Sequence, residues 1–199
     1  MEKFPPKGTK LTDKKKKANY VVTREGKKNG TVTYTKPTSK NITFVSVPKT
    51  ITIDNITYKV TAIAPKAFKN CKKLKKVTIK SNVTVIGNEA FSGCSKLQTV
   101  TMGKKVTTIG NKTFYKCRSL TKITIYSQIN SIGKQAFYGC KELKSVTIKT
   151  SKLTTKNVGS KAFSGIHDKA RITVPKKKVK EYTKLLKAKG IGSEVLIKN

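Results

Sequence analysis

Four cysteines at a constant spacing are the first residues of this sequence that could do chemistry. They stand 23 residues apart, at Cys71, Cys94, Cys117 and Cys140. An even number of cysteines is compatible with disulfide bonds, and thiolates are also common zinc ligands. Ile166 takes the same position in the next unit, so the position suits a small or medium apolar group. No histidine stands nearby to complete a metal site. We therefore expect four buried free thiols, no metal and no cofactor.

The other reactive side chains give little support for catalysis. The one histidine, His167, precedes Asp168, but adjacent residues in a turn rarely aim at a common nucleophile. The chain also has only 9 acidic residues and no tryptophan. We expect an exposed turn histidine, no catalytic residues and a protein that is not an enzyme.

The charge balance is unusual. The 199 residues include 45 basic and 9 acidic side chains, for a formal net charge of +36, and only three of the basic residues are arginine. Lysine is a compact, hydrated charge without the fork of arginine. The excess therefore favours diffuse attraction to a negative partner over sequence-specific reading of nucleic acid. Non-specific binding of nucleic acid or another polyanion stays open as an alternative.

Segments that would target or anchor the chain are not evident in this sequence. A membrane helix needs about 20 predominantly apolar residues, and the opening residues MEKFPPKGTK lack the apolar stretch of a signal peptide. We expect no membrane insertion.

The elements that position the cysteines repeat with a period of 23 residues. Each unit has a phenylalanine, a cysteine three residues later, a short alternating segment such as V-T-I, and then an Ile-Gly pair. The phenylalanines of this register are Phe68, Phe91, Phe114, Phe137 and, after a longer interval, Phe163. One unit alone buries too little apolar surface to offset the entropy of ordering its chain. The period therefore predicts stacked coils with short parallel strands, in which the phenylalanines and cysteines form a continuous internal ladder.

The pattern divides the chain into four parts. Residues 1–17 are expected to be a flexible basic lead-in, and residues 18–56 a β-rich N-terminal cap containing a hairpin. Residues 57–174 form the solenoid of about five repeats. Residues 175–199 are expected to form a C-terminal cap with a helix and a last strand. Val179, Tyr182, Leu185 and Leu186 lie on one face of that helix.

One row of polar residues is predicted to point outward from the strands. Where the flanking valine and isoleucine face the core, the threonine between them faces solvent. The candidate binding residues on and beside this row are Lys76, Thr78, Lys80, Thr101, Lys122, Thr124, Tyr126, Thr147 and Lys149. Basic and neutral residues alternate from coil to coil on one flank, which limits repulsion. Threonine also simply favours strands, so a binding role and a purely structural role both remain open.

The repeat units resemble a known family. LKKVTIKSNVTVIGNEAFSGC and LTKITIYSQINSIGKQAFYGC are similar to the BspA-type leucine-rich repeat, and the resemblance covers about residues 57–190. The tail ITVPKKKVKEYTKLLKAKG is similar to the C-terminal end of surface proteins of that family from gut Firmicutes. The resemblance implies a right-handed solenoid, a secreted or cell-surface location, and a role in adhesion and in protein or glycan binding. Thr113 departs from the family pattern, which has alanine there.

Taken together, these features predict a non-enzymatic, monomeric interaction module. Its expected partner is a host protein, an anionic glycan or a cell-wall polyanion, bound through the strand face of the solenoid. The alternatives are charge-driven binding of nucleic acid or polyanions and a structural spacer in a larger surface protein.

Overall fold

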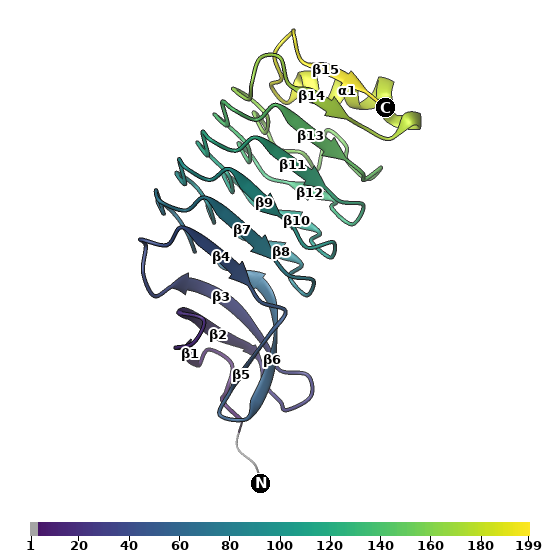
Figure 1. The fold of residues 1–199 in the computed structure, drawn as a ribbon. Coiled ribbons are helices and arrows are strands. Elements are labelled where there is room, and N and C mark those ends of the chain that lie inside the picture. The colour runs from purple at the N-terminus through teal and green to yellow at the C-terminus, as the bar shows by residue number, and fades with distance from the viewer. Residues whose placement is uncertain (1–3) are drawn as a thin grey trace.

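The computed structural model describes residues 4–199 and shows a right-handed solenoid with a sheet on each of two sides, in which the strands of successive coils pair in parallel (Figure 1). We call the sheet that faces the viewer in Figure 1 the front sheet. Its strands, in spatial order, are β4 (Phe44–Val47), β7 (Lys76–Ile79), β9 (Thr99–Thr101), β11 (Lys122–Ile125), β13 (Ser145–Ile148), β14 (Arg171–Thr173) and β15 (Leu196–Lys198). The predicted repeat solenoid of short parallel strands is confirmed.

The opposite side is an eight-stranded sheet, the rear sheet, which joins the N-terminal cap to the coils. Its strands are β1 (Lys10–Asp13), β2 (Ala18–Arg24), β3 (Thr31–Pro37), β6 (Ile56–Ile63), β8 (Val85–Ile86), β10 (Thr108–Ile109) and β12 (Ser131–Ile132), with β5 (Thr50–Ile53) paired to β6. β1, β2 and β3 are antiparallel, whereas β3 pairs with β6 in parallel. The cap therefore continues the hydrogen-bonded ladder of the solenoid.

The prediction that residues 1–17 form a flexible lead-in is wrong for the second half of this segment. Lys10–Asp13 forms β1 and pairs with β2, and the backbone amide of Gly8 donates to the carbonyl of Val22 at 2.8 Å. Leu11 packs against the core, which gives this short strand a buried contact. Four residues with one apolar side chain are too short a pattern to recognise in the sequence. Residues 1–3 lie outside the described residues.

β4 belongs to the solenoid, although the sequence groups it with the N-terminal cap. It pairs in parallel with β7, in the register Phe44↔Lys76 and Ser46↔Thr78. The F-V-S-V segment alternates like V-T-I, but no phenylalanine and cysteine of the 23-residue register precede it. The period therefore does not extend to β4, whereas the hydrogen bonding does.

The interior is an aromatic ladder. The ring centroids of Phe68 and Phe91 lie 4.9 Å apart, and those of Phe91 and Phe114 lie 5.4 Å apart, with nearly parallel planes. Phe137 and Phe163 continue the stack. At the other end Tyr34 of β3 stacks on Phe68 at 5.0 Å. Residues with a common position in each coil therefore lie above one another, as predicted.

The cysteines form a second buried ladder. All four are buried free thiols. Cys94 Sγ donates to the carbonyl of Phe68 at 3.0 Å, and Cys117 and Cys140 repeat this bond one and two coils further on. Burial raises the pKa of Cys94 and Cys140 to about 12, so these thiols stay protonated at neutral pH.

The alanine-to-threonine departure at position 113 is accommodated inside the stack. Thr113 is fully buried, and its hydroxyl lies 2.8 Å from the carbonyl oxygen of Gly110 and 3.2 Å from that of Gly87. The extra polar atom therefore has partners and carries no desolvation penalty for an unmade bond.

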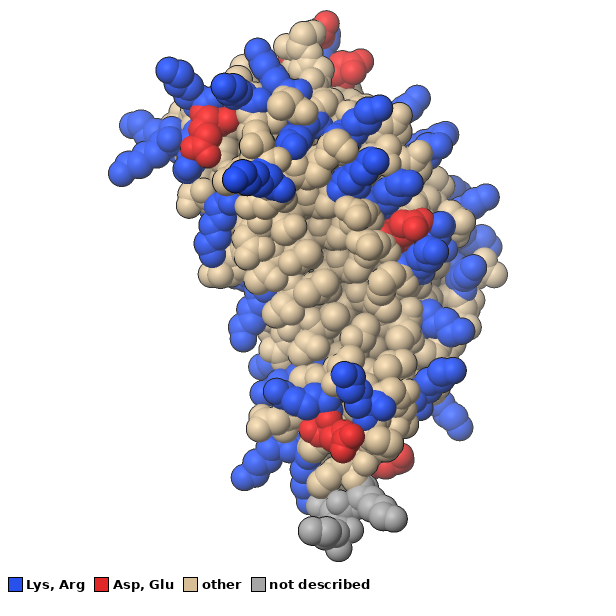
Figure 2. Space-filling view, turned by 180° about the vertical axis from the view of Figure 1, so that it is seen from behind, with Lys and Arg blue, Asp and Glu red and all other residues tan. Residues whose placement is uncertain are grey.

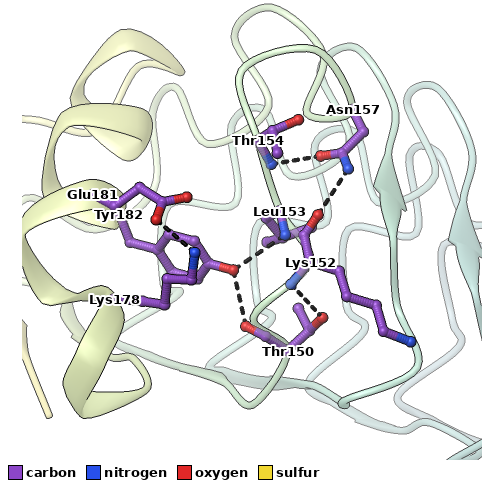
Figure 3. Close-up of polar contacts among 8 residues, drawn as sticks. All are labelled: Thr150, Lys152, Leu153, Thr154, Asn157, Lys178, Glu181 and Tyr182. Carbon is purple, nitrogen blue, oxygen red and sulfur yellow. Dashed lines mark hydrogen bonds and ion pairs between the residues drawn. The ribbon is translucent and has the colours of Figure 1, made fainter.

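A short helical segment covers the C-terminal end. It consists of a 3₁₀ turn, Lys176–Lys178, and α1 (Val179–Ala188), which buries Tyr182, Leu185 and Leu186. Tyr182 Oη donates to the carbonyl of Thr150 at 3.0 Å and accepts from the amide of Leu153 at 3.1 Å (Figure 3). The longer interval before Phe163 therefore forms a turn that holds the helix. α1 is too short to cross a membrane, and it is the only α-helix in residues 4–199.

Candidate functional site on the front sheet

The threonine row lies on one continuous surface. Thr78 pairs with Thr101, and Thr124 pairs with Thr147, which pairs with Thr173. Their apolar neighbours on each strand are buried, whereas the threonines are half-buried or exposed. We call the outward side chains of the front sheet the strand face.

The hydroxyl groups of this row are free. The side chains of these five threonines make none of the hydrogen bonds found within residues 4–199. In contrast, two threonines of the rear side use their hydroxyls internally: Thr84 Oγ1 donates to the carbonyl of Thr61 at 3.2 Å, and Thr107 Oγ1 donates to that of Thr84 at 3.1 Å. The strand face therefore presents hydrogen-bonding groups to solvent in a regular array.

Lysines flank the row at alternate rungs. Lys76 pairs with Thr99, and Thr99 with Lys122, so one neutral rung separates the two exposed lysines. Adjacent strands lie about 4.8 Å apart, which places these lysines about 10 Å apart in the stacking direction. This distance is close to the screening length at 0.1 M salt, so positive charge accumulates on the face with limited self-repulsion.

The opposite flank contains an aromatic ring and a shallow depression. Lys149 Nζ lies 5.8 Å from the ring centroid of the half-buried Tyr126, within cation–π range. A depression of about 240 Å³ lies beside it, bordered by Thr101, Lys122 and Thr124. A side chain on the neighbouring Gly103 would place its Cβ 2.7 Å from the carbonyl oxygen of Lys80, so glycine is required there. The nine predicted binding residues thus share one surface.

Sequence reasoning assigned the end strands of the front sheet to the two caps, as a strand of the N-terminal cap and the last strand of the C-terminal cap, and did not place them on the strand face. β4 adds Ser46 and Phe44, whose side chain is 74% exposed, and β15 adds Leu196 and Lys198. The alternation of F-V-S-V was a usable signal for β4, because it matches the other front strands.

Charge is distributed unevenly around the molecule. From behind, the middle of the surface carries neither Lys or Arg nor Asp or Glu, and the charged side chains lie along its borders and at both ends (Figure 2). This is the side of β8, β10 and β12, where Val85 is exposed. The candidate lysines belong to the front sheet instead.

The other candidate reactive residues, His167 and Asp168, lie in a turn. The turn position of His167 is as expected, but this side chain is half-buried rather than exposed, and its Nδ1 accepts from the amide of Lys169 at 3.1 Å. Asp168 beside it is exposed. Within residues 4–199 no three His, Cys, Asp or Glu side chains gather as metal ligands would.

The two stacked sheets and the repeated coil define a leucine-rich repeat solenoid. The chain matches the model of the BspA type leucine-rich repeat region in six copies over residues 61–184, and it belongs to that family. The sequence pattern gave about five repeats. Comparison with curated proteins finds no match.

Solved bacterial structures share the fold. A leucine-rich repeat protein of T. pallidum is 27% identical with a TM-score of 0.68, and the match covers 84% of this chain and 73% of that one. One from Bacteroides capillosus is 24% identical, with a TM-score of 0.61 and coverage of 70% and 98%. The pneumococcal vaccine antigen PcpA is 21% identical, with a TM-score of 0.70 and coverage of 98% and 49%. Because the last two proteins are less than 25% identical to this chain, their similarity concerns the fold alone.

Proposed function

We propose that this protein is a non-enzymatic interaction module, located at the cell surface or outside the cell, that binds an anionic glycan through the strand face. The single observation that carries the proposal is the row of five threonine hydroxyls that make no hydrogen bond within residues 4–199, flanked by exposed lysines. Membership in the BspA-type family and the surface origin implied by the resemblance of the tail support the location.

The chemistry of the strand face fits a polar polyanion. The net charge of +36 attracts a negative partner over long range, and the five threonine hydroxyls supply groups for short-range hydrogen bonds. The central rungs present one aromatic ring, Tyr126, among hydroxyl and ammonium groups. Tight protein interfaces depend instead on clusters of buried aromatic and arginine anchors. The composition therefore favours a glycan over a protein surface.

The direct test replaces Lys76, Lys122 and Lys149 together by glutamate. We expect binding to a sulfated glycan array to be lost, because the attraction at the face becomes repulsion. The matched control replaces three exposed lysines of the turns before the phenylalanines, Lys66, Lys112 and Lys161, by glutamate, which changes the net charge equally. Glu89 stands at the equivalent position of another coil and has a positive φ, as these three lysines do. Glutamate is therefore compatible with the backbone conformation of these turns. Binding that survives in the test variant, or is lost equally in the control, overturns the proposed face.

A second variant tests the hydroxyls without changing charge. Thr101→Val with Thr124→Val should weaken glycan binding several-fold, since each lost hydrogen bond is worth about 1 kcal/mol. A salt titration on DNA in parallel separates recognition from generic charge. Equal affinity for DNA and the sulfated glycan contradicts the proposal.

A further inference from the structure

The front sheet has an unpaired edge at its N-terminal end. Within residues 4–199, β7 is the only strand that pairs with β4. The carbonyl of Thr43 accepts from the amide of Lys75 at 2.7 Å, and that of Val47 accepts from Lys80 at 3.0 Å. Because backbone groups alternate between the two sides of a strand, those of Phe44 and Ser46 point away from β7. Two amides and two carbonyls are therefore available at this edge.

The edge opens into a groove rather than into free solvent. The groove has a volume of about 500 Å³ and lies between residues 43–46 on one side and the end of β3 and the β1–β2 turn on the other. Its apolar lining includes Ile42, Val45, Tyr34 and Pro37. An extended segment added to β4 would place every second side chain toward this lining, so apolar residues at alternate positions fit it.

The far wall of the groove is strongly basic. Lys15, Lys16 and Lys17 all line it, and all three are exposed. Lys16 Nζ lies 3.5 Å from the carboxylate of Asp13 and donates to the carbonyl of Thr50 at 3.4 Å. The ammonium groups of Lys15 and Lys17 make no ion pair within residues 4–199. The wall therefore carries positive charge beside an unpaired strand, which complements acidic residues of a bound segment.

We propose that this groove binds an extended peptide segment of a partner protein, in which acidic and apolar residues alternate, and that the segment adds to β4 as a further strand of the front sheet. Backbone hydrogen bonds to Phe44 and Ser46 hold the segment, the apolar lining takes its alternate side chains, and Lys15 and Lys17 face its carboxylates. Strand addition of this kind is an established mode of peptide recognition. The site lies at the edge of the front sheet and does not depend on glycan binding by the strand face.

The experiment is a titration of the ¹⁵N-labelled full chain with an acetylated and amidated peptide of alternating aspartate and valine. We expect the amide resonances of Phe44 and Ser46 to shift and their hydrogen exchange to slow. The key comparison is the same peptide with its alternate amides N-methylated. The N-methylated peptide keeps the charge but loses the backbone N–H donors along one edge. It should bind about tenfold more weakly. Equal binding of both peptides shows simple charge attraction and overturns strand addition.

Variants of the chain give an independent readout. Ser46→Pro removes one free-edge amide, at a position where an edge strand tolerates proline, and should weaken peptide binding, while Ser46→Ala should not. Lys15→Gln with Lys17→Gln should also weaken it, whereas the charge-matched Lys104→Gln with Lys105→Gln should leave it unchanged. Lysines also protect strand edges from self-association. A different result would contradict the proposal: the native chain does not bind the peptide, and the Lys15 and Lys17 variant dimerises. The two lysines would then only protect the edge from self-association.

Discussion

The middle coils and the two ends of this solenoid are stabilised by different kinds of contact. In the middle, every coil repeats one set: a phenylalanine stacked on its neighbours and a thiol bonded to the preceding coil. At the C-terminal end, one side chain, Tyr182, joins the helix to a turn about 30 residues earlier. At the N-terminal end the rear sheet continues into the cap, whereas the front sheet stops at the unpaired edge of β4.

This difference separates repeated contacts from individual ones. A repeated contact is supported from both sides, so its position in the stack is fixed by its neighbours. An end contact depends on single residues that no other coil duplicates. Within residues 4–199, both terminal strands of the front sheet, β4 and β15, have one unpaired edge. The groove and its lysines lie beside β4, which is why we place a binding site there.

The largest effect is expected in the middle of the aromatic ladder. Phe114→Ala removes a fully buried ring that lies between Phe91 and Phe137. Truncation of a buried phenylalanine costs about 3–5 kcal/mol. Chemical denaturation should show this loss in the free energy of unfolding.

The control for this variant is the exposed phenylalanine of the front sheet. Phe44 is 74% exposed, so Phe44→Ala should change the free energy of unfolding by less than about 0.5 kcal/mol. Similar costs for the two substitutions would show that the ladder is not a continuous interior, and the contrast between middle and ends would fail.

An intermediate effect is expected where the helix meets the last full coil. Tyr182→Phe keeps the ring but removes the hydroxyl that bonds the backbone of Thr150 and Leu153. Leaving these buried groups without a partner costs about 1–3 kcal/mol. Hydrogen exchange should speed up in α1 before it does in the middle coils.

Tyr138→Phe is the matched control for the hydroxyl. Tyr138 is half-buried and stacks on Tyr115, and its hydroxyl makes no hydrogen bond within residues 4–199. We expect unchanged stability there. Uniform acceleration of exchange in α1 and the middle coils after Tyr182→Phe would contradict a separate C-terminal contact.

The sequence predicts the repeated part of this fold well, because each coil repeats the same spacing of apolar residues. The positions of Phe91 and Cys94 in the interior follow from the period alone, and the amphipathic pattern identifies the C-terminal helix. The outward direction of Thr124 likewise follows from the alternation of its strand.

The ends are harder to predict because their contacts occur once. β1 has a single apolar residue in four, and β4 lies before the first complete unit of the period. The link between Tyr182 and Thr150 depends on the path of a longer turn, which spacing does not specify. The groove depends on how the β1–β2 turn lies opposite β4, so its lysines, Lys15 and Lys17, carried no signal beyond their charge.

The smallest effect distinguishes the N-terminal end of the thiol ladder from its middle. Burial raises the pKa of all four thiols, to about 12 for Cys94 and Cys140, whereas at Cys71 the nearby Lys40 acts in the opposite direction. The thiolate is the reactive form. Iodoacetamide at pH 9 should therefore modify Cys71 before Cys94 and Cys140 in the folded chain, as mapped by mass spectrometry.

The same shifts give a pH dependence of stability with a defined sign. Between an unfolded-state pKa of about 8.5 and the native value of about 12 for Cys140, the native state keeps a proton that the unfolded state releases. The free energy of unfolding therefore falls as pH rises through this window. For one thiol the loss is about 1 kcal/mol between pH 8.5 and 9.5. Cys140→Ala should lose less stability than the native chain over that interval, and equal losses would show that this thiol is not held protonated by burial.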